Sequence, residues 1–124
     1  MSADQQYGSI PAGAVEAAPG LWRTSVQRFD LSVPGREMIQ VRVDIEPTSP
    51  PIRHYHPGEE IIYVLEGSLE YAIDGQETKV YHTGEGLTVP SGVIHAVRNV
   101  GTGIATELAT YIVETGKPLL VVAQ

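Results

Sequence analysis

The sequence contains no cysteine, so neither disulfide bonds nor thiolate metal ligands are available to this protein. Positive charge is also scarce: 8 basic residues stand against 15 acidic ones, and the formal net charge at pH 7 is −7. This balance argues against nucleic acids and anionic membrane surfaces as partners. No run of about 18 apolar residues is present, and the N-terminus lacks a basic segment followed by an apolar one. We therefore expect no membrane span and, by default, a cytoplasmic location.

The length of the chain, 124 residues, is typical of one domain. A chain of this size buries roughly two thirds of its unfolded surface, which is enough for a self-sufficient core. The 13 glycines and 9 prolines are scattered rather than clustered, as in all-β domains with many tight turns. Residues 1–20 are rich in Ala, Gly and Pro and are expected to form an N-terminal arm, and residues 21–124 are expected to form the domain proper.

Alternation of polar and apolar residues marks the expected strands. It is clearest over residues 38–45, where eight positions alternate. Residues 69–73 and 77–81 flank Asp74-Gly75 and predict a hairpin with a type I′ turn. Residues 93–97 and 104–113 predict two further strands.

The C-terminal run from Leu119 to Val122 consists of four large aliphatic residues and needs a surface to cover it. Trp22, near the start of the domain, also needs a surface to cover it. We expect a homodimer in which terminal segments cover the neighbouring sheet. The alternative is that the tail closes its own barrel.

Two short segments carry the candidate metal ligands. In the first, His54 and His56 are two residues apart, so on a strand their side chains share one face, about 6.6 to 6.8 Å apart along the chain. Pro57 and Gly58 fit the central positions of a type II turn, which lets Glu60 face the same ion from the next strand. In the second segment, a Pro-Ser-Gly turn at residues 90–92 introduces His95.

Three imidazoles and one carboxylate form a ligand set of intermediate softness. Such a set suits one divalent ion of Fe, Mn, Co, Ni, Cu or Zn, whereas Mg and Ca sites are richer in oxygen.

The spacing of the first segment extends beyond the histidines. Glu60 follows His56 after three intervening residues, and Gly67 follows Glu60 after six more. The second segment has a spacing of its own: Gly84, Pro90, Gly92, His95 and Asn99.

Together the two spacings resemble the two signature motifs of the cupins, and nine of ten fixed positions match. The departure is Thr48, which stands where the first motif opens with glycine. The resemblance implies an all-β fold, a single antiparallel jelly-roll β-barrel with a metal ion at its inner wall. It also implies that the ligands are the residues that match the motifs: His54, His56, Glu60 and His95. The resemblance also implies a catalytic role for Glu60, which could leave the ion and act as the general base, as the equivalent carboxylate does in some cupins.

Two other titratable residues near the motifs are not expected to bind metal. Glu59 is one position early, so its side chain should point to the opposite face of the strand. His82 lies outside both motifs, beside a Thr-Gly turn, and is expected at the surface.

Four protein ligands on a six-coordinate ion leave two adjacent positions for water or a chelating substrate. With Fe or Mn the site would suit a dioxygenase. With Zn or Ni it would suit a lyase, isomerase or cyclase, because the metal acts as a Lewis acid toward a bound carbonyl.

The expected substrate pocket is mainly apolar. Alternation along the strands places Ile62 and Val64 on the side of Glu60, and Val97 on the side of His95. Gln40 and Arg42 share one face of their strand and could anchor polar groups of a substrate; a solvent-facing pair is an equally good interpretation. Tyr63 and Tyr71 are expected to be packing residues rather than catalytic phenols.

Three classes of function remain open from the sequence. The first is a mononuclear metalloenzyme acting on a small, fairly apolar organic substrate. The second is a metal-assisted module that binds or senses a small molecule without turning it over. The third is a storage or structural barrel, against which the complete ligand set argues. The fold alone does not choose among them.

Overall fold

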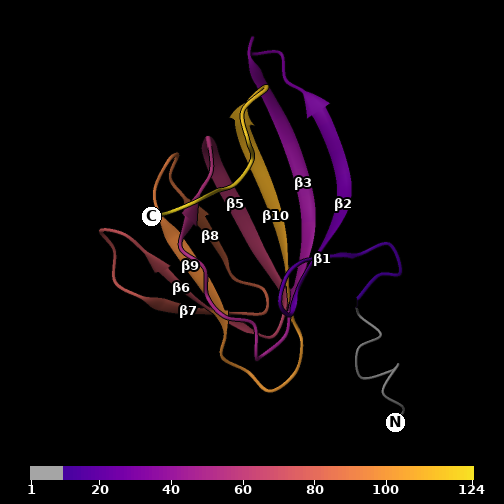
Figure 1. Ribbon diagram of the computed structural model, residues 1–124, viewed down its shortest axis with the longest axis vertical. Coiled ribbons are helices and arrows are strands. Elements are labelled where there is room, and N and C mark those ends of the chain that lie inside the picture. The colour runs from indigo at the N-terminus through magenta and orange to yellow at the C-terminus, as the bar shows by residue number, and fades with distance from the viewer. Residues whose placement is uncertain (1–9) are drawn as a thin grey trace.

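Two antiparallel β-sheets face each other in the computed structural model, which describes residues 10–124 (Figure 1). One sheet has the strand order β1-β2-β3-β10-β5-β8, and the other has the order β11-β4-β9-β6-β7. The all-β, antiparallel jelly-roll fold expected from the sequence is confirmed. Among the described residues no helix is long and apolar enough to cross a membrane. The strands, in chain order, are β1 Val15–Ala18, β2 Leu21–Asp30, β3 Arg36–Ile45, β4 His54–Tyr55, β5 Gly58–Glu66, β6 Ser68–Ile73, β7 Lys79–His82, β8 Gly86–Val89, β9 His95–Asn99, β10 Ala105–Glu114 and β11 Val121–Val122.

The strands expected from alternation are present. Residues 38–45 lie within β3, and the predicted hairpin is the β6–β7 pair, in which Leu69 is opposite Tyr81. Its predicted type I′ turn is wrong, because Asp74 lacks the positive φ that this turn requires. The two later segments correspond to β9 and β10. The first strand, β1, begins at Val15 and pairs with β2, so the sheet starts six residues before the expected boundary at Leu21. Residues 1–9 of the expected arm lie outside the described residues.

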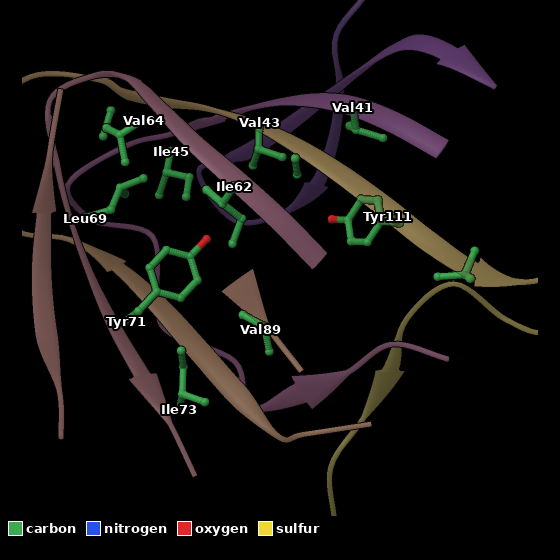
Figure 2. Close-up of a cluster of buried hydrophobic side chains, with 13 residues drawn as sticks. Val41, Val43, Ile45, Ile62, Val64, Leu69, Tyr71, Ile73, Val89 and Tyr111 are labelled. Carbon is green, nitrogen blue, oxygen red and sulfur yellow. The ribbon is translucent and has the colours of Figure 1, made fainter. Parts of the chain in front are cut away.

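The core fills the space between the sheets. On β5 every second side chain is buried, and Ile62 and Val64 point inward among the residues drawn in Figure 2. The intervening side chains of β5 include an exposed apolar row on the outer face, formed by Ile61, Tyr63 and Leu65. Because side chains alternate across a strand, this pattern also decides that Glu60 faces inward.

Gly58 is required for a different reason from the one expected. Its φ is not positive, and it is the first residue of β5, so the predicted type II turn at Pro57 and Gly58 is wrong. A Cβ atom at this position would lie 1.9 Å from the carbonyl oxygen of Ile112 on β10. Glycine therefore permits the close approach of two backbones beside the site. At Gly92 the expectation of a turn holds, because its φ is 74° and the amide of Val93 donates to the carbonyl of Pro90.

The C-terminal segment packs on its own chain. β11 pairs with β4, so that Val122 is opposite His54, and the amide of Ala123 donates to the carbonyl of Arg53 over 2.9 Å. Leu119 is half-buried against the core. The tail thus closes its own barrel, which is the alternative to covering a neighbouring sheet. The homodimer stays a prediction.

Candidate metal centre

Three histidines from two neighbouring strands meet on the inner side of the smaller sheet. His54 lies on β4 opposite His95, the first residue of β9, and His56 follows β4 directly. One ring nitrogen from each histidine lies within 4.8 Å of the other two, and the ring centroids are 4.3 to 5.1 Å apart. His56 and His95 are 2% and 1% exposed. This cluster is able to hold one metal ion.

The backbone selects the tautomer of each histidine. The Nδ1 atom of His54 donates to the carbonyl of Ile52 over 2.7 Å, and that of His95 donates to the carbonyl of Val93 over 2.9 Å. The Nδ1 atom of His56 donates to the carbonyl of Leu119 in the C-terminal segment over 2.7 Å. A carbonyl oxygen can only accept, so each Nδ1 carries the hydrogen and each neutral ring keeps its lone pair on Nε2. This is the outer-shell arrangement found at histidine metal sites.

Glu60 on β5 brings a carboxylate to the same point. Its Oε1 atom lies 3.2 Å from Nε2 of His56 and 3.1 Å from Nε2 of His95. Nε2 of His56 is buried and has no hydrogen-bond partner, although Glu60 is near. Lone pairs on two nitrogens and an oxygen that face one another in a dry site need a positive charge between them. A divalent ion supplies that charge, so the residues present fit a metal.

The electrostatics of the cluster agree with ligand roles. Burial lowers the pKa of His54 to about 4, an effect larger than the opposing one of its hydrogen bond to Ile52, so its ring is neutral at pH 7. Burial alone would raise the pKa of Glu60. The imidazole rings of His56 and His95 beside the carboxyl group outweigh burial, and the pKa of Glu60 falls below its ordinary value. Neutral imidazole and ionised carboxylate are the forms that bind metals.

A cavity of about 170 Å³ adjoins the histidines. Of the cluster, His54, Glu60 and His95 reach its surface. The mouth of the cavity lies between β1, the segment before β4 and the C-terminal segment, because the exposed lining residues belong to these three segments. Most of its wall is apolar; the residues that line it beyond the cluster are Ala17, Ala18, Leu21, Arg23, Val43, Pro50, Ile52, Tyr71, Val97, Glu107, Tyr111, Leu120 and Val122.

The pocket residues expected from the sequence are mostly elsewhere. Val97 lines the cavity as expected. Ile62 and Val64 do share the inner side with Glu60, but they are 2% and 0% exposed and belong to the core instead. Gln40 and Arg42 do not line this cavity either, because Val41 and Val43 occupy the inward positions of β3 and turn their neighbours to the outer face.

On that outer face the two polar side chains have local partners. The amide of Gln40 donates to Thr110 Oγ1 on β10 over 3.1 Å, and Arg42 forms an ion pair with the buried Asp44 at 3.1 Å. These contacts tie adjacent positions of the sheet together. The positions of Gln40 and Arg42 therefore agree with the solvent-facing interpretation of this pair.

Two residues of the cavity were not singled out as functional from the sequence. Glu107 on β10 is 2% exposed, and Tyr71 on β6, expected only to pack, donates its hydroxyl hydrogen to Glu107 Oε1. The hydroxyl groups of Tyr71 and Tyr111 both point into the interior between the sheets (Figure 2). Burial raises the pKa of Glu107 to about 8, and the nearby charge of Glu60 adds to this effect. One signal was present in the sequence: a glutamate between two alanines on one face of an apolar strand.

The two residues not expected to bind metal do lie apart from the site. Glu59 is exposed on the outer side of β5. His82 is exposed at the end of β7, where its Nδ1 atom lies 2.9 Å from the hydroxyl oxygen of Ser68.

Comparison with known proteins identifies the class of this chain. Residues 41–118, more than half of it, match the family described as the cupin domain. The protein therefore belongs to the cupin family, as the two motifs indicated.

Individual relatives come from several kinds of enzyme. The polyketide synthase CurC of Streptomyces cyaneus is 49% identical over 49 residues, which are 39% of this chain and 31% of CurC. The chain thus spans about a third of the length of this curated relative. The polyketide cyclase RemF from Streptomyces resistomycificus has a TM-score of 0.66 at 22% identity, covering 90% of this chain and 74% of RemF. An oxalate decarboxylase from Lactobacillus farciminis has a TM-score of 0.69 at 16% identity, covering 94% of this chain and 34% of the enzyme. At these identities the structural likenesses concern the fold.

Proposed function

We propose that this protein is a mononuclear metalloenzyme of the lyase, isomerase or cyclase type. Its substrate is a small, fairly apolar carbonyl compound with two oxygens that chelate the ion, such as a 2-oxo acid or a β-diketone. The observation that carries the proposal is the convergence of three Nε2 lone pairs and the Glu60 carboxylate at the wall of an apolar cavity.

The residues that would hold the ion are His54, His56, Glu60 and His95. A divalent ion of Fe, Mn, Co, Ni, Cu or Zn supplies Lewis acidity, which stabilises the negative charge of an enolate. The chain's own residues exclude water and exchange protons. Apolar residues such as Val43 exclude water, and the buried carboxyl of Glu107 offers a group that can exchange a proton.

The carboxyl group of Glu107 inside the cavity favours proton-transfer chemistry over oxygenation. The names of two relatives, a polyketide synthase and a polyketide cyclase, refer to chemistry on compounds with repeated carbonyl groups, which supports the same choice. A dioxygenase is the second outcome that the test must separate, since Fe or Mn on the same ligands would suit it.

Elemental analysis of the purified protein tests the metal site. We expect about one transition metal ion per chain, and a loss of at least tenfold in the His54→Ala, His56→Ala double variant, because two ligands are removed. His82→Ala is the matched control, since this histidine is exposed and outside the cluster. A double variant that keeps its full metal content would overturn the assignment.

The reaction class is tested with the metal-loaded protein and a β-diketone in an oxygen electrode. We expect no oxygen uptake above the rate given by the free metal ion. Stoichiometric oxygen consumption would instead identify a dioxygenase and refute the lyase, isomerase or cyclase assignment.

A further inference from the structure

The inner face of β10 carries one carboxyl group in a row that is otherwise without charge. The inward positions are Ala105, Glu107, Ala109, Tyr111 and Val113, and all five are buried. A carboxyl group in such a row is costly unless it has a partner or a task. Glu107 lines the same cavity as Glu60 and His95, so it faces the space that a substrate would occupy.

Tyr71 fixes the orientation of this carboxyl group. Its hydroxyl donates to Glu107 Oε1, and its ring lies 6.4 Å from the ring of His95 with an angle of 21° between the planes. Tyr71 therefore connects the carboxyl group to the wall of the metal centre. Because Oε1 accepts the phenol hydrogen, the other oxygen of Glu107 is the one left to exchange a proton.

The charges around Glu107 favour a form that can donate. Burial and the neighbouring carboxylate of Glu60 raise its pKa, while Arg23 and the hydrogen bond from Tyr71 lower it less. Arg23 itself donates to the hydroxyl of Tyr111 over 3.3 Å. The buried carboxyl group therefore holds its proton more tightly than an exposed glutamate does, and it can both donate and accept a proton.

We propose that Glu107 is the catalytic general acid and base of the cavity, and that Tyr71 is the residue that positions it. This role rests on the proposed function. When the carboxylate form of Glu107 acts as base, the C–H bond next to the substrate carbonyl breaks and its hydrogen forms an O–H bond on Glu107. The electron pair of the C–H bond becomes the C=C bond, and the π pair of the carbonyl moves onto its oxygen, which completes the enolate. In the reverse direction the carboxyl group returns the proton to carbon, and no oxidant is needed.

The test follows the C3 protons of 2-oxobutanoate in D₂O by proton NMR, with the metal-loaded protein. We expect the wild type to accelerate exchange of these protons for deuterium. Glu107→Gln should slow exchange at least 100-fold with unchanged metal content, because an amide keeps the shape but cannot transfer the proton. Tyr71→Phe should slow it about tenfold at an unchanged half-saturating concentration. Glu77→Gln, at an exposed position, is the matched control and should exchange at the wild-type rate.

A second measurement needs neither metal nor substrate. The infrared spectrum of the metal-free wild type in neutral D₂O should show the carbonyl band of a protonated, buried carboxyl group, and Glu107→Gln should lack it. If the Glu107→Gln variant does not fold, Tyr71→Phe and the wild type are compared instead, both with isotope-labelled glutamate. Loss of the Tyr71 hydroxyl should shift the carbonyl band of Glu107, and that shift assigns the band to this residue.

The outcomes separate the two proposals. A Glu107→Gln variant that binds metal and exchanges at the wild-type rate overturns the role of Glu107 and leaves the proposed function standing. A wild type that binds metal but exchanges no C3 proton overturns the proposed function and the role of Glu107 with it. Absence of the infrared band overturns the role of Glu107 alone.

Discussion

Removing the charge of Glu107 is expected to stabilise the metal-free protein at alkaline pH and to have little effect at acid pH. The group is buried, and its pKa is about 8 in the folded protein against an ordinary value of 4.5. The folded state therefore holds this proton more tightly than the unfolded state. Between these two pH values the folded form keeps the proton and the unfolded form has lost it, so stability falls as pH rises.

The size of the effect follows from the same two values. Each pH unit between 4.5 and 8 removes about 1.4 kcal/mol, which amounts to about 5 kcal/mol over the whole interval. That is a large share of the roughly 5 to 15 kcal/mol that stabilises a typical domain. Glu107→Gln abolishes this dependence, because the amide stays neutral and can still accept the hydrogen bond from Tyr71.

The assay is urea unfolding followed by circular dichroism in the presence of a chelator, for the wild type and Glu107→Gln, from pH 5 to pH 9. We expect the two free energies of unfolding to agree within about 1 kcal/mol at pH 5 and the variant to be about 3 to 5 kcal/mol more stable at pH 9. Glu60 stays ionised in the folded protein over this range, and the titration of His54 is common to both proteins and largely cancels in the difference. A difference that stays constant across this range would refute the reasoning.

Three further predictions concern other parts of the structure. Gly58→Ala should cost at least about 3 kcal/mol and lower the Tm by about 10 °C, because its Cβ would meet the carbonyl of Ile112; Gly13→Ala, with open space around it, is the control in the same thermal scan. A chain that ends at residue 117 should bind metal 10- to 100-fold more weakly in a competition titration, because His56 loses its hydrogen-bond acceptor Leu119; an unchanged affinity would contradict the outer-shell role of the tail. The predicted homodimer should appear in sedimentation equilibrium at micromolar concentration, and a monomer there would rule it out.

The cluster was predictable from the sequence because local geometry brings its members together. His54 and His56 need only an extended backbone to share a face, and the turn at Gly92 places His95 at the start of β9. Glu60 needs only the alternation of β5. The turn expected at Gly58 was wrong because the need for glycine there comes from β10, which approaches from far along the chain. Contacts of that kind leave no local pattern.

The cavity was harder to predict for the same reason. Val43 and Val97 line it, while Ile62 and Val64, also inward-facing, are covered by the opposite sheet. Facing inward is a property of one strand, whereas lining a cavity depends on what the other sheet leaves uncovered.

Glu107 shows the limit of alternation most clearly. On β10 the face with Ala105, Ala109, Tyr111 and Val113 is the more apolar one, although the other face also carries Leu108 and Ile112. Alternation favours burial of the first face but places a carboxyl group on it, so alternation alone does not decide the direction of Glu107. The register with β3 and β5 decides it, placing Ala109 opposite both Val41 and Ile62 in the core. Once that register is known, Glu107 must face inward as well, and a carboxyl group beside the histidine cluster follows from strand pairing rather than from any motif.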